Sequence, residues 1–490
     1  MTTKITTSIA LFLSCFCFAL PSLSAQGGTG YGLKKISATE YTAESLAFML
    51  GHRQQIAIFN DSFTRAIIEL PVMVHIIRKD DASGSVSVAE CQAALKQLNE
   101  KFLPIYLRFL SLPDYNYINS SYFYAFDKSK EEELCAKYDV PNVINLYIIG
   151  TLKIDKNNYN GYTYPPTNRP KDRIFVTYKT LMDKVTLPRQ MGHYLSLYPT
   201  HGTHATERGN ELADGMNCKT EGDELCDTPA DPRLDGRMVD GRCTYIGNMQ
   251  DGNNRFYRPM IENYMSDNPR ISCLTTFTRQ QYGRMLYAAL NIRNYLAFPR
   301  NGMSAKQRKK LEESYGISAD VDLLFDGMTP SVTLERNLYI VNKKQQAGNS
   351  FKINISNHRK CYIYVLEGDQ ERGVQLLYPN KGDKLFFDDK TTRFSLPADD
   401  QSFTVDSKGK GSNYITILYS KNQLNIQDVL TKINSVEDSK LNILQRIYFV
   451  LGEDIVPIND LSYDTKGLIK VSGITTERTL VPIFIEYRQD

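Results

Sequence analysis

The stretch RQMGHYLSLYPTHGTH, residues 189–204, comes shortly after the run RIFVTY, residues 173–178, in a chain of 490 residues. The earlier run is rich in β-branched and aromatic residues and predicts a buried strand, whereas Met191, Tyr194 and Leu195 recur at helical spacing. A helix packed on a sheet is the building block of an α/β layer. The stretch therefore predicts such a layer, and its polar residues decide what chemistry the helix can support.

Segments closer to the N-terminus extend the same layer. The runs IIELPVMVHII, residues 67–77, and VINLYII, residues 143–149, predict two more buried strands. Between them, residues 87–102 begin with Ser87 and Glu90 at the spacing of a capping box, and apolar residues then follow at helical period. The order of strand, helix and strand predicts an α/β domain, which we place at residues 68–298.

The part of that domain after the quoted stretch is predicted to be irregular. Residues 200–271 are rich in Gly, Asp, Asn and Pro, which favours a long loop, and a helix at residues 277–296 then closes the domain. Four cysteines fall in or beside this loop without the tight Cys-x-x-Cys repeats of a structural zinc site. We expect two disulfides with three alternative pairings among Cys218, Cys226, Cys243 and Cys273.

The N-terminus has the composition of a secretory signal peptide. Lys4 precedes an apolar run from Ile9 to Leu20, and small residues precede a cleavage point after Ala25. This run is shorter than the roughly 20 residues that cross a membrane, and no other span is expected. A lipid anchor on Cys15 is the less favoured alternative, because the preceding residues match a lipobox poorly. The sequence thus predicts a signal peptide at residues 1–25 and a secreted or periplasmic protein, where disulfides form.

The remaining segments divide the chain further. Residues 26–67 are predicted to be a pro-segment or an N-terminal brace, and residues 299–325 a charged linker. Residues 326–490 contain short alternating runs separated by turn residues, which favours a β-sandwich-like α+β domain with one helix at residues 426–451. The net charge of +3 lacks the basic excess of nucleic-acid-binding proteins, so no nucleic-acid partner is expected.

Zinc peptidases provide the comparison for the quoted helix. Their pattern is His-Glu-x-x-His-x-x-Gly-x-x-His, in which two histidines one helical turn apart and a third after a glycine turn bind Zn²⁺. The remaining coordination position holds water, and the glutamate accepts the proton of that water as it attacks a peptide carbonyl.

Aligned with this pattern, the chain keeps only the second histidine, His193. Arg189 puts a permanent cation at the first ligand position, and Pro199 offers no side-chain ligand at the third. Gln190 stands at the general-base position but cannot accept a proton. Ser196 replaces the glycine, at a cost of about 1–3 kcal/mol if the turn requires a left-handed backbone. We therefore expect no catalytic residue, no metal ligand and no cofactor at this helix.

Several further motifs resemble the bacterial branch of the pappalysin family of metzincin metalloproteases. In chain order they are LPVMVHIIRKDDASGSVS, YTYPP, DRIFVTY, HGTH, ELADGMNCKTEGDELCDTPADPRL, ENYMSD and CLTTFTRQQYGRM, spread over roughly residues 68–298. The resemblance implies a metzincin-like zincin fold with a cleft beneath an edge strand. It also implies that Met265 forms the Met-turn, and that the disulfides are Cys218–Cys243 and Cys226–Cys273. Structural calcium near Asp223 and Asp227 is a further property of some relatives.

Three functions remain open at this stage. The first is a non-catalytic pseudoprotease that still binds a peptide or protein ligand in its cleft. The second is a zinc metallopeptidase whose site has moved to His193, His201, His204 and Glu207, since two histidines and a carboxylate can hold zinc. The third is an envelope adaptor acting through the C-terminal β domain, which resembles a bacterial domain of unknown function.

Overall fold

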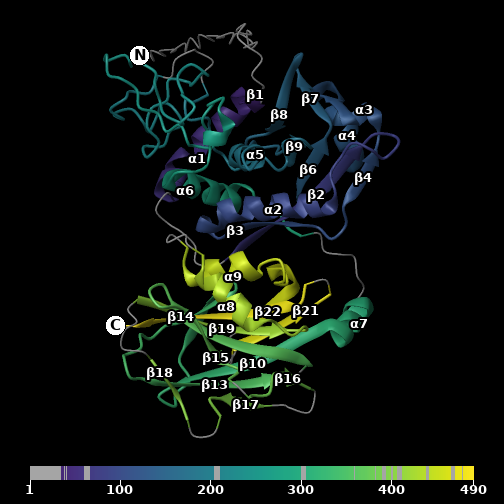
Figure 1. The fold of residues 1–490 in the computed structure, drawn as a ribbon, viewed down its shortest axis with the longest axis vertical. Coiled ribbons are helices and arrows are strands. Elements are labelled where there is room, and N and C mark those ends of the chain that lie inside the picture. Colours follow the sequence, from purple (N-terminus) through teal and green to yellow (C-terminus); the bar gives the residue numbers. More distant parts are fainter. Residues whose placement is uncertain are drawn as a thin grey trace, which may run out of the picture.

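The computed structural model describes residues 35–37, 39, 41–59, 67–203, 210–298, 305–357, 359–380, 382–388, 393–398, 401–405, 411–436, 441–464, 469–476 and 478–489. The predicted signal peptide, residues 1–25, lies outside these ranges. The described chain is an α+β protein with a mixed α/β part followed by a β-rich part (Figure 1).

The first part is built on a nine-stranded sheet in the order β3-β2-β6-β9-β8-β7-β5, with β1 added to β8 and β4 added to β2. Strands β2, β6 and β9 run parallel, and β8 is antiparallel to β9. The predicted strands at residues 67–77, 143–149 and 173–178 are thus confirmed. The strands are β1 (Lys35–Ser37), β2 (Ile68–Arg78), β3 (Leu107–Ser111), β4 (Asn116–Asn119), β5 (Ala125–Asp127), β6 (Ile144–Ile149), β7 (Thr151–Ile154), β8 (Asn157–Thr163) and β9 (Arg173–Thr177).

Helices cover this sheet and share one core with it. Ser87 caps helix α2 and forms the predicted capping box with Glu90. Apolar side chains of α2, α5 and α6 join those of β2, β6 and β9 in a single buried cluster. The helices are α1 (Ala43–Phe59), α2 (Val88–Phe102), α3 (Ser121–Tyr124), α4 (Glu131–Tyr138), α5 (Thr186–Tyr194) and α6 (Arg279–Tyr287), which continues as a π-helical turn (Ala288–Ile292).

The second part contains two sheets that pack face to face. One has the order β17-β13-β10-β21-β20 with β18 on β13, and the other β11-β12-β22-β19-β14-β15 with β16 on β14. Apolar side chains of both sheets form one buried cluster, so the predicted sandwich is confirmed. The strands are β10 (Gly316–Phe325), β11 (Val332–Glu335), β12 (Leu338–Val341), β13 (Ser350–Asn357), β14 (Cys361–Asp369), β15 (Gly373–Tyr378), β16 (Phe386–Phe387), β17 (Phe394–Leu396), β18 (Phe403–Thr404), β19 (Gly411–Ser420), β20 (Leu461–Asp464), β21 (Ile469–Ile474) and β22 (Leu480–Gln489).

Two predictions for this second part were wrong. The end of the predicted linker forms α7 (Ala305–Tyr315) and then β10, which pairs with β13 and β21 inside a sheet. Alternate β10 residues such as Val321 and Leu323 are buried, and the intervening aspartates gave the segment its linker-like charge. The single helix predicted at residues 426–451 is two helices, α8 (Ile426–Asn434) and α9 (Ile443–Leu451), because Asn442 starts a new capping box.

Helices α8 and α9 lie between the sandwich and the α/β part (Figure 1), and their apolar side chains form a cluster with Ile67, Leu103 and Tyr106. A buried ion pair of the α/β part lies at this contact region, and a hydrogen bond from the C-terminal part reaches it. Arg108 Nη1 lies 3.1 Å from Glu69 Oε1, and the Ile458 amide donates to Glu69 Oε2 at 2.7 Å. Burial raises the pKa of Glu69, and the charge of Arg108 opposes this shift. The two parts are therefore joined by both apolar and ionic contacts.

Candidate functional site

Helix α5 contains Arg189, Gln190 and His193, and it lies deep in the molecule. All nine of its residues are buried, and it packs against β8 and β9. Gly192 faces Met265, because a Cβ atom added at Gly192 would lie 2.8 Å from the Met265 sulfur. The Thr200 amide also donates to the Met265 carbonyl at 3.1 Å. Residues around Met265 therefore form a floor beneath α5, where the resemblance places the Met-turn.

Arg189, at the position of the first metal ligand, is bound to this floor. Its guanidinium donates to the carbonyls of Tyr264 and Ser266, and it forms an ion pair with Asp267 at 2.7 Å. The side chain is only 2% exposed. Burial alone would raise the pKa of Asp267, but the charges of His201, Arg189 and Arg233 together lower it to about 2. Arg189 thus has its own set of buried acceptors and does not merely occupy space.

His193, aligned with the second ligand position, has hydrogen-bond partners within the chain. Its Nδ1 lies 3.1 Å from the Leu197 carbonyl and 2.7 Å from the Tyr41 hydroxyl. A carbonyl can only accept, so we assign the proton to Nδ1, which leaves a lone pair on Nε2. Burial, assisted by the Arg189 charge, lowers the pKa of His193 to about 3, and the ring is therefore neutral. The Nε2 atom is buried and has no hydrogen-bond partner in the described part of the chain.

The end of α5 bears out the backbone argument made for Ser196. Ser196 has φ of +82°, in the left-handed region where the aligned pattern has glycine. The helix ends there because a residue in the left-handed conformation stops the α-helical hydrogen-bond series. The chain then turns through Pro199 to His201, whose Nε2 lies 3.8 Å from Asp267 Oδ2. The turn of the family pattern is thus retained without its glycine or its third histidine.

The relocated zinc site can be followed only in part. His193 and His201 are buried in the same region, whereas His204 and Glu207 lie outside the described residues. Within the described ranges, no group of three or more His, Cys, Asp or Glu side chains is arranged to hold a metal ion.

Sequence reasoning missed a contribution from the N-terminal segment. The Tyr41 hydroxyl donates to the Leu197 carbonyl at 2.7 Å, and its ring packs edge-on against Tyr198. Helix α1 follows and places Met49 against Tyr198 and Tyr287. Burial raises the pKa of Tyr41 well above its usual value, which keeps the hydroxyl protonated as a donor. No spacing rule connects Tyr41 to a helix about 150 residues later, so the sequence held no signal for this contact.

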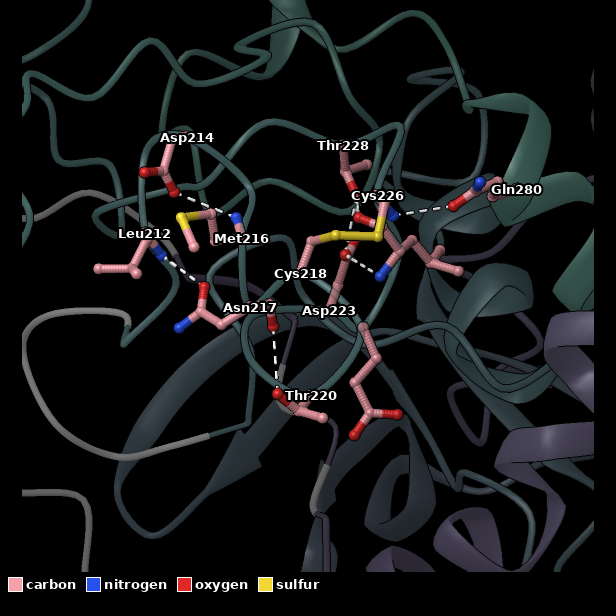
Figure 2. Close-up of a disulfide and its surroundings, with 12 residues drawn as sticks. Leu212, Asp214, Met216, Asn217, Cys218, Thr220, Asp223, Cys226, Thr228 and Gln280 are labelled. Atoms are coloured by element: carbon pink, nitrogen blue, oxygen red, sulfur yellow. Dashed lines mark hydrogen bonds between the residues drawn. A yellow bond between two sulfur atoms is a disulfide. The ribbon is translucent and has the colours of Figure 1, made fainter.

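The disulfide loop contains both predicted bridges, but the pairing implied by the resemblance was wrong. The bonds are Cys218–Cys226 and Cys243–Cys273, in place of Cys218–Cys243 and Cys226–Cys273. Figure 2 shows the first bond closing a short loop around Asp223. That loop is tightened because Asp223 accepts from the Leu225 amide and the Thr228 hydroxyl, which brings Cys226 back toward Cys218. These hydrogen bonds within the turn therefore favour a disulfide between Cys218 and Cys226, the nearer cysteine in the sequence.

The two aspartates expected near calcium have separate roles. Asp227 accepts from the Thr278 hydroxyl and the Gln280 amide, and so it caps the start of α6. Asp223 lies instead near Glu211, and each has a buried carboxylate oxygen without a partner among the described residues. Burial raises the pKa of Glu211 to about 9, with Asp223 adding to the shift, and burial raises the pKa of Asp223 to about 7.

Comparisons with known proteins give the following picture. Residues 345–423 match the family described as a domain of unknown function, DUF4384, which confirms the predicted resemblance of the C-terminal part. No curated protein matches the chain. The chain is similar to a solved structure of a promirolysin point mutant from Tannerella forsythia, with 17% sequence identity and a TM-score of 0.36, covering 52% of this chain and 92% of that one. In the described ranges no helix is both long and apolar enough to cross a membrane.

Proposed function

We propose that this protein is an exported, pappalysin-like pseudoprotease that binds a peptide or protein ligand and does not hydrolyse it. The observation that carries the proposal is the position of Arg189. Its buried guanidinium takes the place of the first zinc ligand and is bound to three acceptors in the turn around Met265. A cation there repels Zn²⁺ and donates no lone pair. Gln190 at the general-base position removes the second requirement for hydrolysis.

The export and ligand-binding parts of the proposal have independent support. Two disulfides favour an oxidising compartment, which agrees with the signal peptide expected at residues 1–25. Ligand binding rests on the edge of β8, where the chain's own β1 already adds a strand, since a strand edge can take up an extended chain. The match to DUF4384, a domain of unknown function, does not indicate an activity.

Metal content and proteolysis test the proposal directly. The purified protein is expected to contain far less than one zinc per chain and to leave casein and gelatin intact, because two ligand positions and the base position are substituted. Atomic absorption measures the first quantity and gel electrophoresis the second. The matched variant combines Arg189→His, Gln190→Glu and Pro199→His, and we expect it to bind zinc where Gln190→Glu alone does not.

The relocated-site alternative makes the opposite prediction. It expects about one zinc per wild-type chain, and it expects that single replacement of His193, His201 or His204 removes this zinc. If the protein also hydrolysed substrate and a chelator stopped the hydrolysis, these results would establish a metallopeptidase and contradict the pseudoprotease proposal.

We also propose that Glu211 and Asp223 contribute to a structural calcium site, with backbone carbonyls as the other ligands. Ca²⁺ takes oxygen ligands of both kinds. Each carboxylate has an unpartnered buried oxygen, and burial raises the pKa of each, although Arg284 and the hydrogen bonds from Leu225 and Thr228 partly oppose the shift at Asp223. A cation between them would stabilise both charges.

At mildly alkaline pH, millimolar calcium is expected to raise Tm by about 5 °C, because an ion that binds only the folded state stabilises it. Differential scanning fluorimetry with and without a chelator measures the shift. The Glu211→Gln variant should lose the shift, whereas Glu132→Gln on the exposed surface should keep it. An equal shift in both variants would exclude Glu211 as a ligand.

A further inference from the structure

The β-sandwich contains a pocket of about 450 Å³, and every residue that lines it falls within the DUF4384 match at residues 345–423. Both sheets contribute to its walls, since β13 and β18 belong to one sheet and β14 and β15 to the other. Sites for small molecules commonly have volumes of roughly 300–1,000 Å³. The pocket is therefore large enough to be a ligand site of this domain.

The apolar side of the pocket is largely aromatic. Phe351 of β13 pairs with Phe403 of β18, and their ring centroids lie 5.1 Å apart. Phe351 is buried in the core of the sandwich, whereas Phe403 and the other apolar lining residue, Leu377, are half-buried. An accessible aromatic ring offers a ligand a flat apolar surface. This side can therefore pack against an apolar face of a ligand.

The polar side of the pocket is a network of buried charges. Glu367 accepts hydrogen bonds from Arg372 at 3.0 Å and from Gln375 at 2.8 Å. The Tyr487 hydroxyl donates to the same carboxylate at 3.1 Å. Arg372 also forms an ion pair with Asp369, and the carboxylate side chains of Glu367 and Asp369 are 6% and 4% exposed. The network thus fixes the position of Gln375 at the pocket wall.

The stability of the sandwich does not explain this network. Replacing a buried set of ion pairs by well-packed apolar residues is often neutral or stabilising, because the removal of charges from water costs more than their attraction returns. Buried charged groups that line a pocket are instead typical of sites that bind ligands. We therefore consider what ligand the network would suit.

The charges of the network restrict the class of ligand. Glu367 and Asp369 both pair with the one guanidinium of Arg372, so the three groups together carry one negative charge. An anion is repelled by this net charge, and a cation finds both carboxylates already hydrogen-bonded. Gln375 and Thr404 are exposed at the pocket and offer uncharged donors and acceptors. The pocket thus suits an uncharged ligand that combines hydroxyl groups with an apolar face.

We propose that this pocket binds a sugar unit of a neutral saccharide. The C–H face of the sugar ring packs against Phe403, and its hydroxyl groups exchange hydrogen bonds with Gln375 and Thr404. Arg372 is a positioning residue, because it holds Glu367, which in turn holds Gln375. The inference goes beyond the proposed function, since it concerns the DUF4384 domain and not the region around α5.

Isothermal titration calorimetry of the full chain tests the site with four neutral tetrasaccharides, made of glucose, galactose, mannose or N-acetylglucosamine. At least one is expected to bind with a Kd of about 1 mM or lower. Phe403→Ala should weaken that binding at least about tenfold, because it removes the ring against which the sugar packs. Gln375→Ala should also weaken it about tenfold, because the hydroxyl groups lose a partner.

The control is Phe386→Ala, a substitution at an exposed phenylalanine of β16 that does not line the pocket, and it should bind as the wild type does. Tetragalacturonate has the same length but carries carboxylates, and it should bind at least about tenfold more weakly than the best neutral sugar. Thermal melts establish that each variant is folded, and Gln375→Ala carries the test if Phe403→Ala is not.

Three results would overturn the inference. They are no binding of any neutral tetrasaccharide by the folded wild type, unchanged affinity in the folded pocket variants, and tighter binding of tetragalacturonate than of the neutral sugars. Metal content and proteolysis are measured separately, so the pseudoprotease proposal does not depend on this outcome.

Discussion

Replacing Arg189 with methionine is expected to lower the free energy of unfolding by about 3 kcal/mol or more, the cost of removing one partner of a buried ion pair. Asp267 would lose its closest cation, and the carbonyls of Tyr264 and Ser266 would lose their donor. Asp267 would keep its more distant contacts with His201 at 3.8 Å and Arg233 at 3.6 Å. These contacts should hold the loss of unfolding free energy near about 3 kcal/mol. Urea unfolding followed by circular dichroism measures the change.

The matched control is Arg237→Met. Arg237 also pairs with an aspartate, but its side chain is 93% exposed, and an exposed pair contributes at most about 1 kcal/mol. The double variant Arg189→Met with Asp267→Asn should recover part of the loss, because it removes the uncompensated charge. A single Arg189→Met variant as stable as the wild type would show that Arg189 is tolerated at this position without being required there.

Arginine and histidine differ in what they can bind at position 189. A histidine at position 189 could bind zinc, but it could not reach three acceptors with a permanent charge. Arg189 therefore adds an interaction between α5 and the turn around Met265. This interaction stabilises the fold.

Residues close together in the sequence were predicted well. The capping box of Ser87 and Glu90 and the strands around α5 follow from patterns within about ten residues. The expectation that Arg189 and Gln190 do not serve as zinc ligand and general base rests on side-chain type alone. What the sequence could not supply was the set of acceptors around Arg189, which comes from residues 264–267.

Contacts over long distances were missed for the same reason. Tyr41 reaches His193 only because β1 adds to β8, and a three-residue strand has too little pattern to be recognised. The disulfide pairing depended on the turn at Asp223, which the sequence shows only as one of many polar loop residues. Strand β10 was not predicted, because its aspartates gave the segment the charge of a linker. These aspartates alternate with apolar residues, which is typical of a strand with one exposed face.

Replacing Glu69 with alanine is expected to cost about 3–5 kcal/mol, because it leaves Arg108 buried beneath α9 without its carboxylate. The Arg108 side chain is 3% exposed, and its remaining acidic neighbour, Glu453, is 3.8 Å away and largely in solvent. The Ile458 amide would lose its acceptor as well, so both parts of the molecule would be destabilised. Chemical unfolding would report the loss, and limited proteolysis of the whole chain should proceed faster as the parts separate.

Glu132→Ala is the control, since Glu132 contacts Lys171 and Arg173 on the exposed surface and should cost less than about 1 kcal/mol. Glu69→Gln distinguishes charge from shape: it can still accept from the Ile458 amide, so it should lie between the wild type and Glu69→Ala. If Glu69→Ala unfolds in one transition at the wild-type midpoint, the ion pair does not hold the parts together. The apolar cluster of α8 and α9 with Leu103 and Tyr106 would then be sufficient to do so.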